Sequence, residues 1–401
     1  MRIRRLIRLI LATPLAIAFV LIIRLIRPMV LVRVGVLQCD RIGHFMLDTE
    51  LQLLEIENRI IKQPKRTLNI WYAPEPIANR VAYKMWKRVI CVWPNWFMVS
   101  AFRVNNFLPG SIAHQIPNTT STCLDVHNLL DESKPHLFFT EQEIAHGQSI
   151  LRKMGIDQHM KFVCFIVRDS AYTKAVFPEK DMSYHDYRNC DVNDYVLGAE
   201  ALADRGLFVL RMGSIVSKPL RSNHPRVIDY ANSEFRSEFM DIFLGANCMF
   251  CVSDGLGFYA IPAVFRKPNA YVNYSPFHMF YSSRSCDVGI AKTVKHFDSG
   301  ERLRLSEMGR NGVAQFSQTA QYQAAGLVVE SNSPEEIRDL MLEMLDRLEN
   351  KWITRPGDEQ RQERFWSMFS EVIGEERKIC HGEIRSRYGA QFLRDNQKWM
   401  Q

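Results

Sequence analysis

The sequence lacks the short motifs that mark the best-known nucleotide and metal enzymes. It contains no Gly-x-x-x-x-Gly-Lys-Ser/Thr phosphate loop, no Gly-x-Ser-x-Gly nucleophile turn and no His-Glu-x-x-His zinc helix. After the first strand-like run, VLVRVGVL, the stretch RIGHF carries a single glycine where a dinucleotide-binding turn needs three. An Asp-x-Asp metal motif is also missing, since Asp191 and Asp194 have the wrong spacing. These absences argue against a nicotinamide enzyme, and we expect no cofactor and no bound metal.

A disulfide framework is equally poorly supported. The nine cysteines are odd in number, and several of them lie in apolar runs, which is typical of reduced thiols in a cytosolic domain. Cys248 and Cys251 have redox spacing, but they lie inside the run CMFCV, and no second pair completes a zinc site. We therefore expect both thiols to pack in a buried strand.

The positive charge is concentrated at one end of the chain. The formal net charge is +7, and seven arginines lie within the first 33 residues, at positions 2, 4, 5, 8, 24, 27 and 33. The rest of the chain is therefore near neutral, which favours a membrane surface over nucleic acid as a partner.

The run between these arginines, Leu9–Ile23, is free of charge. It is shorter than the ~20 residues that a comfortable transmembrane helix needs. Its small-x-small match, Ala16 to Ala18, lies in the middle of the run, which argues against a cleaved signal peptide. The pattern favours an amphipathic or re-entrant anchor with arginines at the lipid headgroups, and a shallow single-pass span is the alternative.

Strand-like and helix-like segments alternate after Pro28 and begin a second series near residue 160. Capping signals mark two of the helices, with Thr140 three residues before Glu143 and Ser333 three residues before Glu336. This alternation predicts an α/β fold of two Rossmann-like, doubly wound domains facing a cleft. We expect a membrane anchor at 1–28, an acceptor domain at 29–155, a nucleotide-sugar domain at 156–350 and C-terminal helices at 351–401.

Polar residues follow three strand-like runs of the second series, where open α/β sheets bind ligands. Two arginines there could grip a diphosphate, and a Ser-Asp-Gly-x-Gly turn that opens a helix favours phosphate. Taken singly, such features are often only solvated charges or tight turns. Together they predict a phosphate site formed by Arg168, Arg211, Gly213, Ser253, Asp254, Gly255 and Gly257.

The stretch DYRNCDVNDY lies between the first two of these strands. Tyr187, Arg188 and Asn189 are candidates for substrate binding in this loop. The alternative is a helix N-cap at Asp191 or Asn193 behind a decorated loop.

The segments RIGHF, VRDSAY, DYRN, RMGS with a following DYA, and DIFLGANCMFCVSDGLG…FRKPNAYVN together resemble a family of glycosyltransferases from bacterial surface-polysaccharide clusters. The likeness covers most of the chain after the anchor. More loosely, the second series resembles the C-terminal motifs of fucosyltransferases with the two-domain GT-B fold. In that group a strand-end arginine and a serine turn hold the donor diphosphate, at positions that correspond to Arg168 and Ser253. The paired arginines of that motif are replaced by Arg168 and Asp169, which argues against GDP-fucose.

The resemblance implies metal-independent sugar transfer from a nucleotide-activated donor to a surface-glycan or lipid-linked acceptor. Such donors are cytosolic in bacteria, so the body would lie at the cytoplasmic face of the inner membrane, with no role for nucleic acid. The acceptor hydroxyl needs a base, for which His44 is the candidate, oriented by Asp48 one helical turn later. Alternatively, His44 is only a packed residue and Asp48 only favours the helix dipole. The competing function is a non-catalytic, membrane-attached subunit of a polysaccharide assembly complex.

Overall fold

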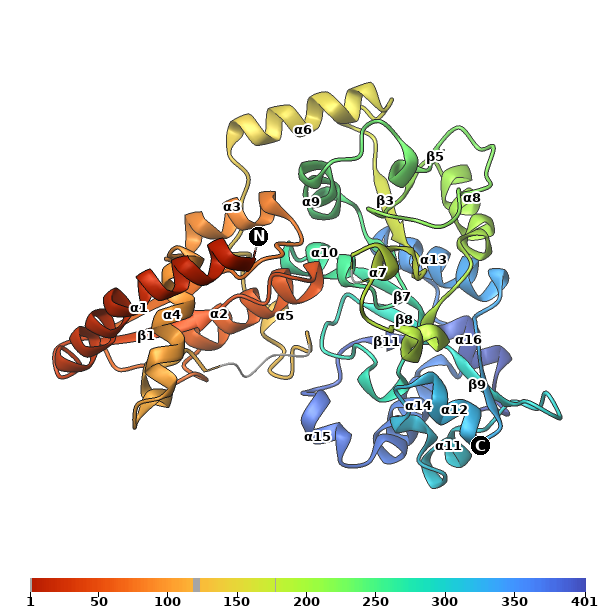
Figure 1. The fold of residues 1–401 in the computed structure, drawn as a ribbon. Coiled ribbons are helices and arrows are strands. Elements are labelled where there is room, and N and C mark those ends of the chain that lie inside the picture. Colours follow the sequence, from red (N-terminus) through yellow and green to blue (C-terminus); the bar gives the residue numbers. More distant parts are fainter. Residues whose placement is uncertain (1, 118–122, 177) are drawn as a thin grey trace. The chain divides into compact units, whose positions relative to one another are not determined.

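The structure is a computed structural model that describes residues 2–117, 123–176 and 178–401, and the side chains of residues 2–11 lie outside the description. The chain forms two compact units (Figure 1). The first unit is Met1–Cys123 with Ser133–Phe139, and the second is Leu124–Glu132 with Thr140–Gln401. The main boundary therefore lies near residue 140 and not at residue 156, and neither 1–28 nor 351–401 stands apart as a unit.

A small parallel sheet organises the first unit. β1 (Leu31–Val36) pairs in parallel with β2 (Thr67–Tyr72), and single parallel bridges add Gln115 beside β1 and Val92 beside β2. With two strands among its described residues, this sheet is smaller than the doubly wound sheet that the sequence predicts. The helices of the unit are α1 (Arg2–Leu25), α2 (Thr49–Glu57), α3 (Arg80–Val89) and α4 (Asn95–Asn106), with a π-helical turn at His44–Asp48 and a 3₁₀ turn at Ser111–His114.

The expected anchor segment is part of this unit. One face of α1 is buried, through Ala12, Ala16, Val20 and Ile23, and it packs against α4. Within the described residues, no helix has both the length and the apolar content that crossing a membrane requires. The expected headgroup contacts of the arginines at 2, 4, 5 and 8 concern side chains that lie outside the described residues.

Ion pairs attach the segment Ser133–Phe139 to the first unit. His136 lies between two carboxylates of α2, with Nδ1 3.1 Å from Glu50 Oε2 and Nε2 2.9 Å from Glu57 Oε1. Glu50 is fully buried, so the imidazolium is its compensating charge. The hydrogen bond with Glu50, supported by Glu57, raises the pKa of His136 to about 9 against the opposing effect of burial.

A seven-stranded parallel sheet forms the centre of the second unit. Its order is β11-β8-β7-β6-β3-β4-β5, so the chain starts in the middle at β3, adds strands on one side and then returns to add β6 on the other. This is the order of a doubly wound sheet, and its switch point lies between β3 and β6. The strands are β3 (Phe162–Ile166), β4 (Phe208–Arg211), β5 (Val227–Ile228), β6 (Cys251–Ser253), β7 (Asn269–Tyr274), β8 (Val288–Ala291) and β11 (Arg387–Tyr388), and β9 (Thr293–His296) pairs antiparallel with β10 (Leu327–Glu330).

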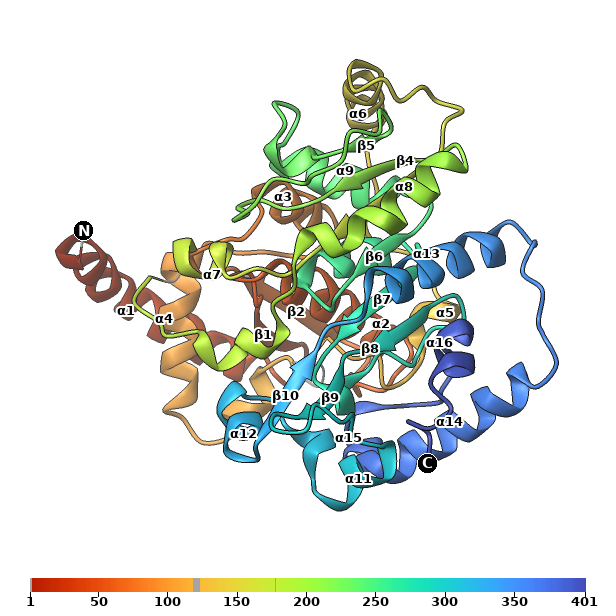
Figure 2. The same cartoon turned by 90° about the vertical axis from the view of Figure 1, so that its right-hand side faces the viewer.

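Helices cover this sheet, and α8 and α13 lie side by side against it (Figure 2). The capping boxes at Thr140 and Ser333 begin α6 and α13 as the sequence predicts. All nine cysteines are free. Cys251 is buried in β6, as the sequence predicts, whereas Cys248 is buried at the C-terminal cap of α9 and not in a strand. The helices of the unit are α5 (Leu129–Glu132), α6 (Glu141–Lys153), α7 (Ala171–Val176), α8 (Val196–Asp204), α9 (Glu238–Asn247), α10 (Ala260–Val264), α11 (Leu305–Arg310), α12 (Thr319–Ala324), α13 (Pro334–Leu348), α14 (Asp358–Ile373), α15 (Glu376–Cys380) and α16 (Ala390–Asp395).

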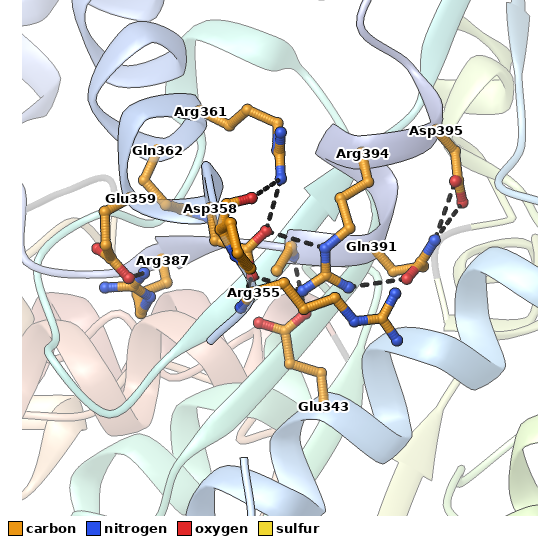
Figure 3. A network of polar contacts seen from close by, with 12 residues as sticks. Glu343, Arg355, Asp358, Glu359, Arg361, Gln362, Arg387, Gln391, Arg394 and Asp395 are labelled. Carbon is orange, nitrogen blue, oxygen red and sulfur yellow. Dashed lines mark hydrogen bonds and ion pairs between the residues drawn. The ribbon is translucent and has the colours of Figure 1, made fainter. Parts of the chain in front are cut away.

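The C-terminal segment belongs to this unit because β11 is the last strand of the sheet. A polar network also connects the helices of this segment with one another (Figure 3). Asp358, at the start of α14, accepts hydrogen bonds from the guanidinium groups of Arg361 and Arg394 and from the backbone N–H of Arg355.

Candidate functional site

The first candidate site lies at the switch point of the second unit. Ile166 pairs with Ser253 at the ends of β3 and β6, so the residues that follow these strands are neighbours. The backbone N–H of Arg168 donates to Asp254 Oδ2 over 2.6 Å. In doubly wound sheets, ligands bind outside the carboxyl ends of the strands at this point, so Arg168 and Asp254 lie where a ligand is expected.

Three cationic side chains gather around Asp254. Arg168 is 9% exposed, and burial lowers the pKa of its guanidinium, an effect to which the nearby charge of Arg188 adds. Lys292 is 5% exposed, and its ammonium donates to the carbonyl oxygens of Tyr187 and Asn189. Asp254 faces these three cations, and Asp194 also interacts with Lys292, so the three cations outnumber the two carboxylates and this part of the sheet edge carries excess positive charge.

Asp254 itself is a perturbed carboxyl group. It is 2% exposed, and burial raises its pKa to about 6 even though the Arg168 N–H and the charges of Arg168, Arg188 and Lys292 all lower it. Burial therefore outweighs its cationic neighbours, and Asp254 changes charge close to neutral pH.

Several polar atoms of this cluster are buried without a hydrogen-bond partner. They are Nε of Arg168, Nε of Arg188, Oδ1 of Asn189 and Oδ1 of Asp254. Buried polar groups in folded proteins are nearly always paired, and unpaired ones often mark a ligand site. Two guanidinium groups with unpaired N–H donors are suited to binding phosphate oxygens.

The serine–glycine turn holds this cluster in place. Ser253 is buried, and its Oγ accepts from the backbone N–H of Gly255. Gly255 has a φ of +80°, and a Cβ there would lie 2.9 Å from the ring of Tyr274, so glycine is needed. Its carbonyl oxygen accepts from Arg188 over 3.1 Å. Gly257 opens a 3₁₀ turn that leads into α10, so a helix follows the glycine turn as the sequence predicts, although α10 has only five residues.

Two of the predicted phosphate residues have other partners. Arg211 is 1% exposed, forms an ion pair with Asp229 at 3.0 Å and donates to the carbonyl oxygen of Lys218. A Cβ at Gly213 would lie 2.5 Å from a methyl group of Val216, so this glycine serves local packing. Arg211 and Gly213 therefore lie outside the candidate site, contrary to the sequence hypothesis.

The loop that contains Tyr187, Arg188 and Asn189 lies beside the cation cluster, in contact with Gly255 and Lys292. These residues end a 3₁₀ helix at Ser183–Arg188, and the ring of Tyr187 packs 5.2 Å from that of Tyr322. The proposed N-cap at Asp191 also exists, since its side chain accepts from the N–H of Asn193. Lys292 was missed in the sequence because the short strand before it, VGIA, was not predicted. A lysine directly after such a strand was the available signal.

The second candidate site lies in the first unit, after β1. His44 and Asp48 are the ends of the π-helical turn, and His44 Nδ1 lies 2.8 Å from Asp48 Oδ2. The other oxygen of Asp48 accepts from the backbone N–H of Cys123 over 2.9 Å. With Nδ1–H donating to Asp48, the lone pair of Nε2 is available to accept a proton. π-Helical turns within helices occur frequently at functional sites.

The thiol of Cys123 lies on the same side of the imidazole, with Sγ 3.3 Å from His44 Nδ1. Among the described residues, His44, Asp48 and Cys123 form a group whose donor atoms all lie within 4.8 Å of one another. An imidazole nitrogen, a carboxylate oxygen and a thiolate together suit a zinc-like cation. This group could not be predicted from the sequence, because Cys123 is 75 positions after Asp48.

No protein-family model matches the sequence, and no curated protein matches it. Among solved structures, it is similar to a family 9 glycosyl transferase from Veillonella parvula, with a TM-score of 0.43 and 10% identity over 79% of this chain and 98% of that one. It is also similar to the E. coli ADP-heptose heptosyltransferase II, with a TM-score of 0.34 and 12% identity over 64% of this chain and 90% of that one. A third similar structure is an E. coli heptosyltransferase with ADP, with a TM-score of 0.32 and 12% identity over 65% of this chain and 90% of that one. These neighbours in structure are all glycosyltransferases.

Proposed function

We propose that the chain transfers a sugar from a nucleotide-activated donor to a surface-glycan or lipid-linked acceptor without a metal ion. The observation that carries this proposal is the cation cluster at the switch point, with buried, unpaired guanidinium N–H groups on Arg168 and Arg188. A nucleoside diphosphate is the leaving group whose charge such a cluster matches. Positive charge held in a buried site stabilises the departing diphosphate, which is the role a metal ion has in other enzymes.

In this mechanism His44 is the base. Nε2 accepts the proton of the acceptor hydroxyl as its oxygen forms the new bond to the anomeric carbon. The bond from that carbon to the diphosphate breaks, and its electron pair leaves with the nucleotide. Asp48, hydrogen bonded to Nδ1, fixes the tautomer and stabilises the imidazolium that forms.

The test is the release of nucleoside diphosphate from a panel of sugar nucleotides in the presence of bacterial lipid-linked glycans. We expect His44→Ala to lower turnover by at least ~100-fold, the usual contribution of a general base, while nucleotide affinity stays unchanged. Normal turnover in this variant would remove His44 from the mechanism. No release by the wild-type chain with any donor would favour the non-catalytic assembly subunit.

We also propose that the protein works at the cytoplasmic face of the inner membrane. Nucleotide sugars are made in the cytosol, and a lipid-linked acceptor is held in the membrane. The concentration of arginines at the N-terminus supports this location.

A further inference from the structure

The outer face of α1 is apolar over residues 12–25, the part of the helix whose side chains are described. Exposed and apolar residues recur opposite the buried face, while the residues facing α4 are small or β-branched. Leu15, Ala18, Ile22, Leu25 and Met29 are spaced three or four residues apart, which places them on one stripe of the helix and the turn after it. The exposed large side chains of this face are Leu15, Ile17, Leu21, Ile22, Leu25 and Met29.

Exposed aromatic side chains also lie on α4 and directly after it. Trp96 on α4 and Phe107, the residue that follows α4, are exposed, Phe107 to 88%, and their spacing of eleven residues corresponds to one side of the helix. Trp96 is in ring contact with Phe97 at 5.9 Å, and Phe97 with Phe19 of α1 at 5.4 Å. Figures 1 and 2 both draw α1 and α4 side by side.

Polar contacts connect the C-terminal end of α1 with the end of α4 and the loop after it. The guanidinium of Arg24 donates to the carbonyl oxygen of Pro109 over 2.7 Å and to Asn105 Oδ1 over 2.9 Å. This holds the C-terminal end of α1 against the loop that carries Phe107. Arg27, in the turn after α1, and Arg103, on α4, are exposed and supply positive charge beside the apolar residues.

We infer that α1, α4 and the loop after α4 form one surface that lies flat on an anionic lipid bilayer, with the apolar side chains among the acyl chains. Because one face of α1 is packed on protein, only its outer face is available to lipid. An apolar face with exposed arginines and a tryptophan has the composition of interfacial helices, and phospholipid headgroups complement its charge. The inference rests on the first unit alone and does not depend on sugar transfer.

Flotation of the full chain with vesicles tests this surface. We expect binding to vesicles of phosphatidylcholine with 30% phosphatidylglycerol, and weaker binding to phosphatidylcholine alone or at 1 M salt. The double substitution Leu15→Glu and Ile22→Glu, and separately Phe107→Glu, should weaken binding at least tenfold. These side chains are exposed, so thermal melting should be unchanged. Phe297→Glu, at an exposed phenylalanine of the second unit, is the matched control and should bind as the wild type does.

Three results would overturn the inference. The first is equal vesicle binding by the wild type and the Leu15/Ile22 double variant, and the second is no vesicle binding by the wild type. The third is a wild-type dimer, seen by light scattering, that the double variant converts to a monomer without any vesicle binding, since a second copy would then cover the surface. Nucleotide binding, measured on the same samples, should be unaffected by these substitutions, which separates this test from that of the catalytic proposal.

Discussion

At the scale of single residues, the candidate site depends on charges whose partners lie far away in the sequence. Arg168 and Asp254 could be predicted because each follows an apolar strand-like run. Arg211 also lies at the end of an apolar strand-like run, but it is paired with Asp229. No local sequence pattern predicts an ion pair with a residue eighteen positions away. Strand-end position therefore predicted where charges lie, but could not distinguish a structural charge from one that is free to bind a ligand.

Asp254 gives the donor site a predicted pH dependence. Its raised pKa of about 6 means that it loses its negative charge as the pH falls from 7 to 5. A sugar nucleotide keeps its charge over this range, so its affinity should rise as Asp254 is protonated, by up to roughly tenfold for each pKa unit by which binding shifts the carboxyl group. Titration calorimetry at several pH values checks this. Asp254→Asn should bind with little pH dependence, and an unchanged profile in that variant would assign the effect to another group.

The position of Cys123 beside His44 and Asp48 leads us to expect that added metal ions affect turnover. A chelator should leave the rate unchanged, because the proposed mechanism uses no metal. Added Zn²⁺ should inhibit, since a cation bound to His44 Nδ1 forces the proton onto Nε2 and removes the base. Cys123→Ser should raise the inhibitory zinc concentration at least tenfold, whereas Cys91→Ser, at an exposed cysteine of the same unit, should not. Equal zinc inhibition in both variants would place the cation elsewhere.

At the scale of secondary-structure elements, the sequence predicted those helix starts that a local capping motif marks. The capping boxes at Thr140 and Ser333 predicted helix starts correctly because both partners lie within four residues. β8 and β11 were missed because they are short and owe their conformation to neighbouring strands. The π-helical turn at His44 was also missed, since it leaves the apolar periodicity of a helix almost unchanged.

Asp358 is predicted to hold α14 and α16 together. It is buried, and although burial raises its pKa, hydrogen bonds from Arg394, Arg355 and Arg361 outweigh this and keep the pKa well below the usual range. Asp358→Asn should lower the free energy of unfolding by about 3 kcal/mol, because it leaves buried guanidinium charge uncompensated. The contribution is fully present at neutral pH and is lost as the pH falls below about 4.

Urea denaturation at pH 7 measures this loss. Glu359→Gln is the matched control, because Glu359 pairs with Arg387 in the same network but is exposed (Figure 3). That change should cost less than about 1 kcal/mol. If both variants lose the same free energy of unfolding, the ion pairs of Asp358 contribute no more than an exposed ion pair does.

At the scale of the whole molecule, the sequence predicted an α/β chain with two parts but not the pairing of its strands. The order β5-β4-β3-β6-β7-β8-β11 creates the switch point, and it is this order that brings Arg168, Arg188 and Lys292 around Asp254. These residues are spread over more than 120 positions, so no motif could contain them. The N-terminal segment shows the same limit, since its packing on α4 depends on residues about 80 positions later.

Calorimetric titration of the full chain with ADP, GDP, UDP and CDP measures whether the cation cluster binds a nucleoside diphosphate, on which the proposed function depends. We predict that the wild type binds at least one of them. Arg168→Ala and Arg188→Ala should each weaken that affinity by roughly 10- to 100-fold, as expected for loss of hydrogen bonds to a charged group. Arg205→Ala, which removes a surface arginine paired with Asp346, should bind normally. Unchanged affinity in both cluster variants, or no binding by the wild type, would contradict the account.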